Sequence, residues 1–355
     1  MRVTIWDVAR EANVSKSTVS NVLRGKPIVT EATRQAVLKA IDRLAYRPSA
    51  AARSLVGRRA HVLGVVVTDI RNPFFGEVAH AIAEAAGRAG YGTILSDLSM
   101  TRPGGASFLD LVPEGRADAL VFAAWPNVPD TDRYLAEADF PIAFVGCRPP
   151  SDLAADWVAV DELGGVATAI RHLVELGHRR IGCIASAEDA AADRIAGYRA
   201  GLAAAGIAVD ESLIVRAEAT EHEADFGSLA GYRAANRLLA VRGRPSAIFA
   251  SDDFLALGVM QALEEHGAMV PGDVSLVGFD DIQFAGLSRI GLTTVCQPRA
   301  FMGQQVVQLV LKRLKGTEPW EPTGILLQPS LVVRSSTGPC RSTLETIPAA
   351  APSEA

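Results

Sequence analysis

Features that mark membrane proteins, secreted proteins and several enzyme classes are missing from this 355-residue sequence. No apolar run approaches the roughly 18 residues that a membrane-spanning helix needs, and the first residues have the pattern of a helix start rather than of a secretory peptide. There is no P-loop, G-x-S-x-G or H-E-x-x-H motif, and the six histidines lack the spacing of metal ligands. We therefore expect a cytoplasmic protein without a metal, a cofactor, a membrane contact or an enzymatic activity.

Cysteine is also scarce. The sequence has four cysteines, which are far apart, form no C-x-x-C pair and lie mostly in apolar, strand-like runs. They are Cys147, Cys183, Cys296 and Cys340. This distribution predicts buried free thiols in a reducing compartment, since a disulfide framework or a metal site would need paired spacings.

The first two dozen residues have the spacing of a helix-turn-helix. Thr4 can cap a first helix, Asn13 suits the left-handed position of a tight turn, and Ser15 can cap a second helix. Apolar residues at helical spacing are expected to face inward, namely Ile5, Val8, Ala9, Val19, Val22 and Leu23. An ordinary helical hairpin is the alternative, but caps, turn and inward positions together favour the helix-turn-helix.

The outward face of the second helix is polar, and the charge of the chain is concentrated near it. That face consists of Lys16, Ser17, Thr18, Ser20 and Asn21, which fit a DNA major groove where base edges offer donors and acceptors. Residues 1–59 hold 12 Lys/Arg and four Asp/Glu, a net charge of +8, whereas the remainder carries −13. A basic end on an acidic body predicts phosphate binding at that end alone.

A third helix and a short linker follow. Thr30 caps an amphipathic helix through about residue 44, with Val37, Leu38, Ile41 and Leu44 expected to face inward. After Pro48, residues 49–57 contain helix formers and a stop glycine but span barely two turns. A helix of that length is not stable alone in water, so this segment should gain order only against a partner.

From residue 61 the pattern alternates between apolar strands and helices. The continuous apolar run at 62–67 is followed by a helix at about 75–89 and a strand at 91–96, and the alternation continues to a strand at 274–279. Such repeats predict parallel sheets with right-handed crossovers. The stretch is longer than one sheet usually takes, so we expect two α/β lobes with a ligand site between them, at the carboxyl ends of strands.

Several stretches, in this order and spacing, resemble the LacI/GalR (lactose-repressor) family of bacterial transcription regulators over roughly residues 3–336. They are residues 4–23, 48–55, 72–75, 176–181, 194–198, 253–258, 270–280 and 292–295. The resemblance implies a homodimer that binds a palindromic double-stranded operator, associates with the nucleoid when bound, and responds to a small effector.

The resemblance also implies a domain order. A helix-turn-helix headpiece at 1–47 and a hinge helix at 48–60 precede a two-lobed, periplasmic-binding-protein-like core at 61–336. We expect the N-lobe at about 61–160 and 291–320, and the C-lobe at about 161–290 and 321–336. Residues 337–355, rich in Pro, Ala, Ser and Glu, should form a disordered tail. They contain no leucine heptad for tetramerisation.

On DNA, the resemblance assigns base reading to Lys16, Ser17 and Asn21. Positions that match family contacts to phosphate, which set register without reading sequence, are Thr4, Thr18, Ser20 and Tyr46. In the hinge, Leu55 matches a leucine that enters the minor groove, and Ala52 a small residue beside it. Solvated surface residues and a linker with an incidental leucine are the alternatives.

Five positions match family contacts to the effector: Phe74, Arg194, Phe226, Asp252 and Asp280. Aromatic faces can stack on sugar C–H groups, while guanidinium and carboxylates take paired hydroxyl contacts, so the set suits a polyol. An Arg194–Asp280 salt bridge and a core role for Phe226 remain alternatives.

Two departures from the family pattern bear on the ligand. Asp252 stands where many sugar-responsive members have Asn, and Gly146 stands where many have an acidic residue. We expect these departures either to reshape the preference for hydroxyl groups or to favour a cationic ligand. Of the adjacent carboxylates at 252–253 and 280–281, we expect the second of each pair to cap the following helix.

The sequence therefore predicts an effector-switched repressor with a sugar or sugar derivative as effector. The same architecture responding to a purine or other non-sugar metabolite is the alternative. A stand-alone sugar-binding protein would need no basic headpiece. An enzyme would need a nucleophile–base pair or a phosphate loop, and neither is visible.

Overall fold

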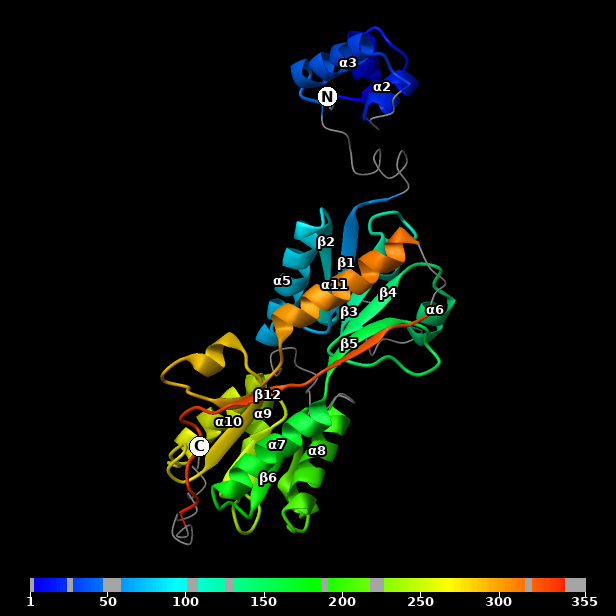
Figure 1. Cartoon of the computed structure of the whole chain (residues 1–355). Helices are drawn as coiled ribbons and strands as arrows, with labels where there is room; N and C mark the ends of the chain where they lie inside the picture. Colours follow the sequence, from blue (N-terminus) through cyan, green and yellow to red (C-terminus); the bar gives the residue numbers. More distant parts are fainter. Residues whose placement is uncertain are drawn as a thin grey trace.

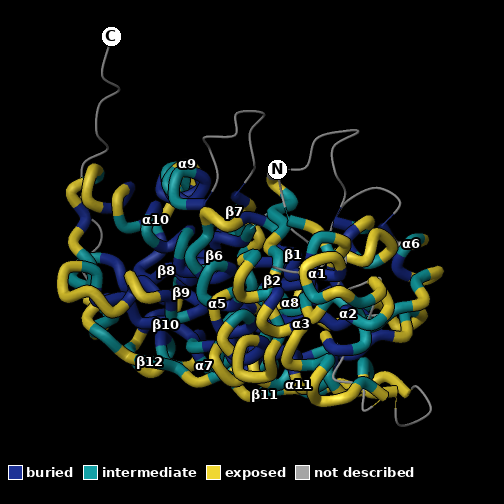
Figure 2. The backbone as a smooth tube through the Cα atoms, turned by 90° about the horizontal axis from the view of Figure 1, so that it is seen from above, coloured by how far each residue is buried: buried dark blue, intermediate teal, exposed yellow. Residues whose placement is uncertain are grey.

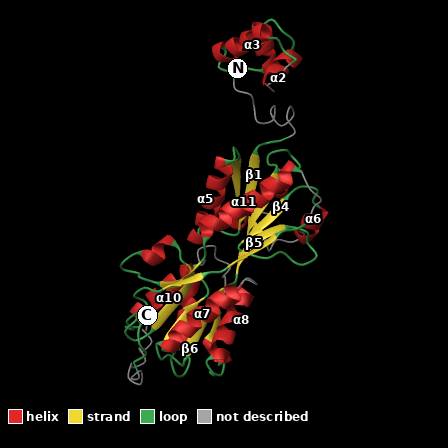
Figure 3. Ribbon diagram, viewed as in Figure 1, coloured by secondary structure: helices red, strands yellow, loops and turns green. Residues whose placement is uncertain are grey.

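The computed structural model describes residues 3–23, 28–46, 59–100, 108–124, 131–186, 191–217, 227–316 and 321–341. In Figure 1 these residues form a small helical headpiece at the N-terminal end and a core of two lobes, one of which lies between the headpiece and the other lobe. Helices flank the strands of both lobes in Figure 3. The expected α/β fold, with a helical headpiece and two parallel-sheet lobes, is confirmed.

The headpiece consists of α1 (Ile5–Glu11), α2 (Lys16–Leu23) and α3 (Glu31–Arg43). The Asp7 carboxylate accepts hydrogen bonds from the Thr4 backbone N–H (2.9 Å) and hydroxyl (2.7 Å), which lower the pKa of Asp7. Asn13 has φ 53°. Ser15 Oγ accepts the Thr18 backbone N–H at 3.1 Å. The predicted caps and turn are therefore present.

Seven buried side chains form the headpiece core: Val8, Ala9, Val19, Val22, Val37, Ala40 and Tyr46. Two inward predictions were wrong, because Leu23 is 39% and Leu38 41% exposed. In each case the preceding valine, Val22 or Val37, occupies the inward position. One residue further along a helix of 3.6 residues per turn lies about 100° round the axis, outside the packed stripe.

The N-lobe contains a six-stranded sheet in the order β11-β5-β4-β3-β1-β2, in which every pair is parallel. Its strands are β1 (Val62–Val67), β2 (Gly92–Asp97), β3 (Ala119–Ala123), β4 (Ile142–Val145), β5 (Asp156–Val160) and β11 (Gly324–Leu327). Its helices are α5 (Pro73–Arg88), α6 (Thr131–Glu137) and α11 (Arg299–Lys315), with short turns η1 (Leu98–Met100) and η2 (Phe108–Leu111). Along α5, the buried side chains recur at helical spacing.

The C-lobe contains a second six-stranded sheet, in the order β12-β10-β9-β8-β6-β7, with only β12 antiparallel to its neighbour. Its strands are β6 (Ile181–Ser186), β7 (Ile214–Ala217), β8 (Ala247–Ala250), β9 (Ser275–Asp280), β10 (Thr293–Cys296) and β12 (Ser330–Val332). Its helices are α7 (Glu162–Glu175), α8 (Ala191–Ala204), α9 (Ser228–Leu239) and α10 (Asp253–Glu265), with short turns η3 (Glu211–Leu213) and η5 (Gln283–Gly286). Figure 2 shows β8 and β9 as buried.

The expected lobe boundaries need correction near the C-terminus. β10 pairs with β9 and belongs to the C-lobe, although 291–320 was expected in the N-lobe. β11 pairs with β5 and belongs to the N-lobe, although 321–336 was expected in the C-lobe. A short apolar run has the same pattern in either sheet, so only its partner strand decides where it belongs.

The described C-lobe extends five residues past the boundary expected at residue 336. Residues 337–341 are described and bonded to the C-lobe: the Cys340 N–H donates to the Leu176 carbonyl at 2.8 Å, and Thr337 Oγ1 lies 3.0 Å from His172 Nε2. The prediction of a disordered tail from 337 is therefore wrong for these five residues, because their polar groups have partners. Residues 342–355 lie outside the described part.

The cysteines are free, as predicted, but only Cys183 is fully buried. Burial raises the pKa of the Cys147 and Cys183 thiols to about 12, which makes them poor nucleophiles. Among the described residues, no helix is long and apolar enough to cross a membrane, and no group of His, Cys, Asp or Glu side chains could hold a metal ion.

Candidate DNA-binding surface and effector site

The polar face of α2 is accessible. Lys16 and Ser17, in the first turn, are exposed, while Thr18, Ser20 and Asn21 are half-exposed. Ser15 Oγ lies 2.7 Å from Ser17 Oγ and 2.8 Å from Thr18 Oγ1, so the cap also orients these two hydroxyls. The α2 side chains predicted to read bases and contact phosphate thus stand on one short helix, and local bonds orient two of them, Ser17 and Thr18.

Two aromatic residues modify the predicted headpiece surface. Tyr46, expected to contact phosphate, is 7% exposed and packs in the headpiece core, so its ring has a structural role. Trp6 was not predicted. It is 61% exposed, and Lys16 Nζ lies 5.2 Å from the centroid of its ring, within cation–π range. The sequence feature that could have indicated it is an aromatic residue at an outward position of α1.

The predicted phosphate contact Thr4 is exposed, but its hydroxyl donates a hydrogen bond to the Asp7 carboxylate.

Three predicted site residues lie outside the described part of the chain. They are the hinge residues Ala52 and Leu55 and the predicted effector contact Phe226. Their roles therefore remain predictions from the family resemblance.

In the C-lobe, the predicted effector residues converge where strands end. Asp280 is the last residue of β9, Asp252 directly precedes α10, and Arg194 lies in the first turn of α8. Because β6, β8, β9 and β10 run parallel, their carboxyl ends meet at one edge of the sheet. This is the edge at which α/β folds bind ligands.

Arg194 is the centre of this cluster. Its Nη2 lies 2.6 Å from Glu162 Oε1, its Nη1 lies 3.8 Å from Asp280 Oδ1, and its guanidinium lies 4.1 Å from the centroid of the Phe279 ring. Nη1 also donates to the Ser251 carbonyl. Burial alone would lower the pKa of Arg194, but the charges of Glu162 and Asp280 outweigh it and raise the pKa. The guanidinium is thus fixed in its charged form.

Glu162, at the start of α7, was missed by the sequence analysis. It is the tightest partner of Arg194, whereas the alternative considered from sequence was Asp280. Glu162 lies 32 residues before Arg194 and in no recognisable pattern with it. Only the packing of α7 on α8 brings the two together.

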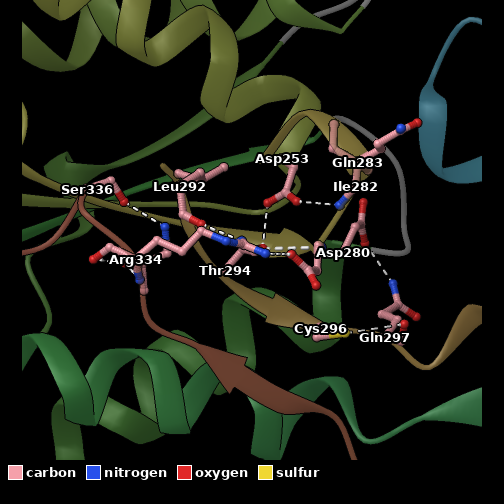
Figure 4. Close-up of polar contacts among 12 residues, drawn as sticks. Asp253, Asp280, Ile282, Gln283, Leu292, Thr294, Cys296, Gln297, Arg334 and Ser336 are labelled. Carbon is pink, nitrogen blue, oxygen red and sulfur yellow. Dashed lines mark hydrogen bonds and ion pairs between the residues drawn. The ribbon is translucent and has the colours of Figure 1, made fainter. Parts of the chain in front are cut away.

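Asp280 is 2% exposed and accepts a hydrogen bond from Gln297 Nε2 at 2.7 Å, as Figure 4 shows. Burial raises its pKa well above the usual value, and Arg194 acts in the opposite sense. Within the described structure, buried Arg194 Nε and Gln297 Oε1 have no hydrogen-bond partner. One donor and one acceptor beside Asp280 are therefore unsatisfied but not exposed, and together they are the complement of a hydroxyl group.

The paired carboxylates behave opposite to expectation. Asp252, not Asp253, caps α10 by accepting the Leu255 N–H at 2.8 Å, and burial raises its pKa. Asp253 is already the first residue of the helix, so its side chain turns to the sheet. There it accepts the Thr294 hydroxyl (2.6 Å) and the Ile282 N–H (2.9 Å), and burial raises its pKa to about 7 (Figure 4).

The other pair was also predicted wrongly. Asp281 does not cap the next turn but pairs with Arg334, with Asp281 Oδ1 2.6 Å from Arg334 Nη2. Asp280 and Asp281 have φ of 115° and 56°, conformations that cost non-glycine residues about 1–3 kcal/mol each. This bend, rather than helix capping, determines where the two side chains lie.

Phe74 belongs to the other lobe. It lies in the first turn of α5, after Asn72, whose side chain accepts the Phe74 N–H at 3.0 Å. Its ring is 7% exposed and packs edge-to-face on Phe75, with centroids 5.3 Å apart. The structure thus joins Arg194 with Asp280 and places Phe74 in the N-lobe core.

Comparison with known proteins decides the family. A family model for bacterial regulatory proteins of the lacI family matches residues 4–49, and one for a periplasmic binding protein-like domain matches residues 170–337. The HTH-type transcriptional repressor PurR of Photobacterium profundum is 34% identical over 336 residues, 94% of this chain and 98% of PurR. The chain belongs to the LacI family.

Solved structures of LacI-family proteins agree. The transcriptional regulator CelR in complex with cellobiose is 30% identical, with a TM-score of 0.68, and covers 94% of this chain and 100% of its own. The lac repressor dimer bound to operator and the anti-inducer ONPF is 26% identical, with a TM-score of 0.78 and coverages of 95% and 100%. The protein is a DNA-binding transcriptional regulator, and these three relatives are regulators rather than enzymes.

Proposed function

We propose that the protein is a homodimeric repressor of a palindromic operator, and that a neutral, hydroxyl-rich effector, most simply a sugar, switches its affinity. The observation that carries the effector class is the cluster around Arg194. Its guanidinium is surrounded by three carboxylates, those of Glu162, Asp252 and Asp280. An acidic or phosphorylated ligand would compete with Glu162, which already pairs with the guanidinium at 2.6 Å, whereas hydroxyl groups can bond to both the guanidinium and the carboxylates. The similarity to CelR, solved with cellobiose, favours a carbohydrate.

In this proposal the headpiece reads the operator through Lys16, Ser17 and Asn21, while Thr4, Thr18 and Ser20 hold phosphates. Leu55 would enter the minor groove, with Ala52 beside it. Truncating Leu55 to alanine should weaken specific binding much more than binding to random DNA, because only the specific complex kinks the duplex. Equal losses of affinity on specific and random DNA would rule out insertion of Leu55 into the minor groove.

A selection from random duplexes, followed by fluorescence anisotropy, tests the function directly. We expect a palindrome to emerge and its affinity to change at least tenfold with one of cellobiose, D-ribose or D-glucose. Guanine tests the alternative of a purine effector, and glucose 6-phosphate tests whether an anionic ligand can act. A response to guanine alone would replace the sugar with a purine, and a response to the phosphate alone would contradict the charge argument.

A further inference from the structure

Arg299 is the first residue of α11, at the point where the chain returns from β10 of the C-lobe to the N-lobe. It connects the two lobes. Its side chain is 16% exposed. Nη1 donates to the Asp280 backbone carbonyl, and Nη2 to the Asp281 carbonyl at 2.5 Å. Its Nε lies 2.8 Å from Glu77 Oε2. The two terminal nitrogens of the guanidinium therefore bond to the bend after β9, while Nε pairs with a carboxylate on α5 of the other lobe.

Glu77 completes the connection from the N-lobe. It lies on α5, and its second oxygen, Oε1, accepts the Gln283 backbone N–H of the C-lobe at 3.0 Å. Glu77 thus contacts the C-lobe directly and, through Arg299, a second time. Three segments far apart in sequence, around residues 77, 280–283 and 299, are held by one carboxylate and one guanidinium.

The segment held in this way is the strained one. Asp280 and Asp281 both have positive φ, which non-glycine residues keep only where their surroundings fix them. The rigid fork of an arginine can hold two adjacent carbonyls at once, which a lysine ammonium does less well.

We propose that Arg299 is a positioning residue of the effector site: it fixes the bend that presents Asp280 and, through Glu77, couples that bend to α5 and the angle between the lobes. The effector role rests on the proposed function. Because α5 also carries Phe74 in its first turn, the same bridge sets the relation between two predicted effector contacts. A movement of α5 away from the C-lobe breaks both bonds of Glu77 and loosens Asp280.

Hydrogen exchange measured by mass spectrometry on the full chain, without DNA or ligand, tests this coupling. We expect R299M and E77Q to exchange about tenfold faster than wild type in peptides that cover residues 278–285. R299K keeps the pair with Glu77 but loses the paired carbonyl contacts, so its increase should be smaller. The control is E84Q on the same helix, whose exposed pair with Arg88 (2.6 Å) does not reach the C-lobe and should leave exchange unchanged.

Small-angle X-ray scattering on the same proteins measures the distance distribution of the whole molecule. A purely local role of Arg299 would leave this distribution unchanged. We expect a broader distance distribution for E77Q and R299M, and the wild-type distribution for E84Q. Exchange at 278–285 as slow as wild type in folded E77Q would overturn the proposal, even if R299M did not fold. Because neither measurement uses an operator or effector, failure of the repressor assignment would be seen separately, in the DNA-binding experiment.

Discussion

The polar face of α2 and the charged cluster of the C-lobe use polar side chains in opposite ways. On α2 the groups are exposed or half-exposed, and their hydrogen bonds are local, such as Ser15 with Ser17. In the C-lobe, Asp280 is buried, the side chains of Arg194 and Glu162 are only 13% and 12% exposed, and all three bond across long stretches of chain. Side chains of α2 should therefore be replaceable at the expense of DNA binding alone, whereas removing the cation of the cluster should also lower the stability of the fold.

Replacing Arg194 with methionine should have the largest effect. The change leaves the carboxylates of Glu162 and Asp280 buried without their cation, which typically costs about 3–5 kcal/mol of unfolding free energy. Urea denaturation measures it. The matched control is Arg199→Met on the same helix, because its pair with Glu211 at 2.8 Å is exposed and should contribute little to stability. Equal, small losses in both variants would show that the cluster is not a buried ion network.

Burial of Asp253 should contribute a fall in stability as pH rises towards about 7. Burial raises its folded pKa to about 7, whereas an unfolded aspartate ionises near 3.9. Between these values the folded state binds more protons than the unfolded state, so the unfolding free energy decreases with pH and levels off above about 7. From pH 5 to 7 the loss from this group is on the order of 2–3 kcal/mol.

Denaturation of wild type and D253N at pH 5, 6 and 7 measures this contribution. Asparagine cannot ionise, so the variant should be less stable at pH 5, through a weakened bond to Ile282, but show a shallower decline. A decline as steep as wild type would assign the pH dependence to another group.

Asn21→Ala should affect DNA recognition without affecting stability. A good contact between an asparagine and a base is worth about 1–3 kcal/mol of discrimination, so affinity for the selected operator should fall about 5- to 150-fold. The dependence on salt should not change, since no charge is lost. The control is Gln35→Ala, at an exposed position of α3, which should leave operator affinity unchanged. Equal weakening on operator and random DNA would make Asn21 a backbone contact.

Local features of the fold could be predicted from sequence because they depend on neighbouring residues. The Ser15 cap, the Asn13 turn and the apolar run of β1 each follow from a few adjacent side chains, and all are present. The same reasoning failed where the exact start of a helix had to be known. We expected Asp253 to cap α10, but the helix begins at Asp253 and its cap is Asp252.

Features that depend on tertiary packing could not be predicted. The pairs Glu162–Arg194 and Glu77–Arg299 join distant segments with no shared periodicity, and the sheet to which β10 belongs is decided by its neighbour β9. The family resemblance located Arg194, Asp252 and Asp280 but not the groups that hold them. The sequence therefore predicted three side chains that the structure brings to one edge of the C-lobe sheet, but not how they are charged and oriented.

The most direct test of coupling between the two regions compares operator affinity with and without the active carbohydrate in wild type and in D280N. We predict a change of at least tenfold in wild type, a much smaller one in D280N, and the same affinity of both proteins for operator alone. A wild type that binds the selected palindrome no better than random DNA with every probe, or a D280N that responds as fully as wild type, would contradict the account.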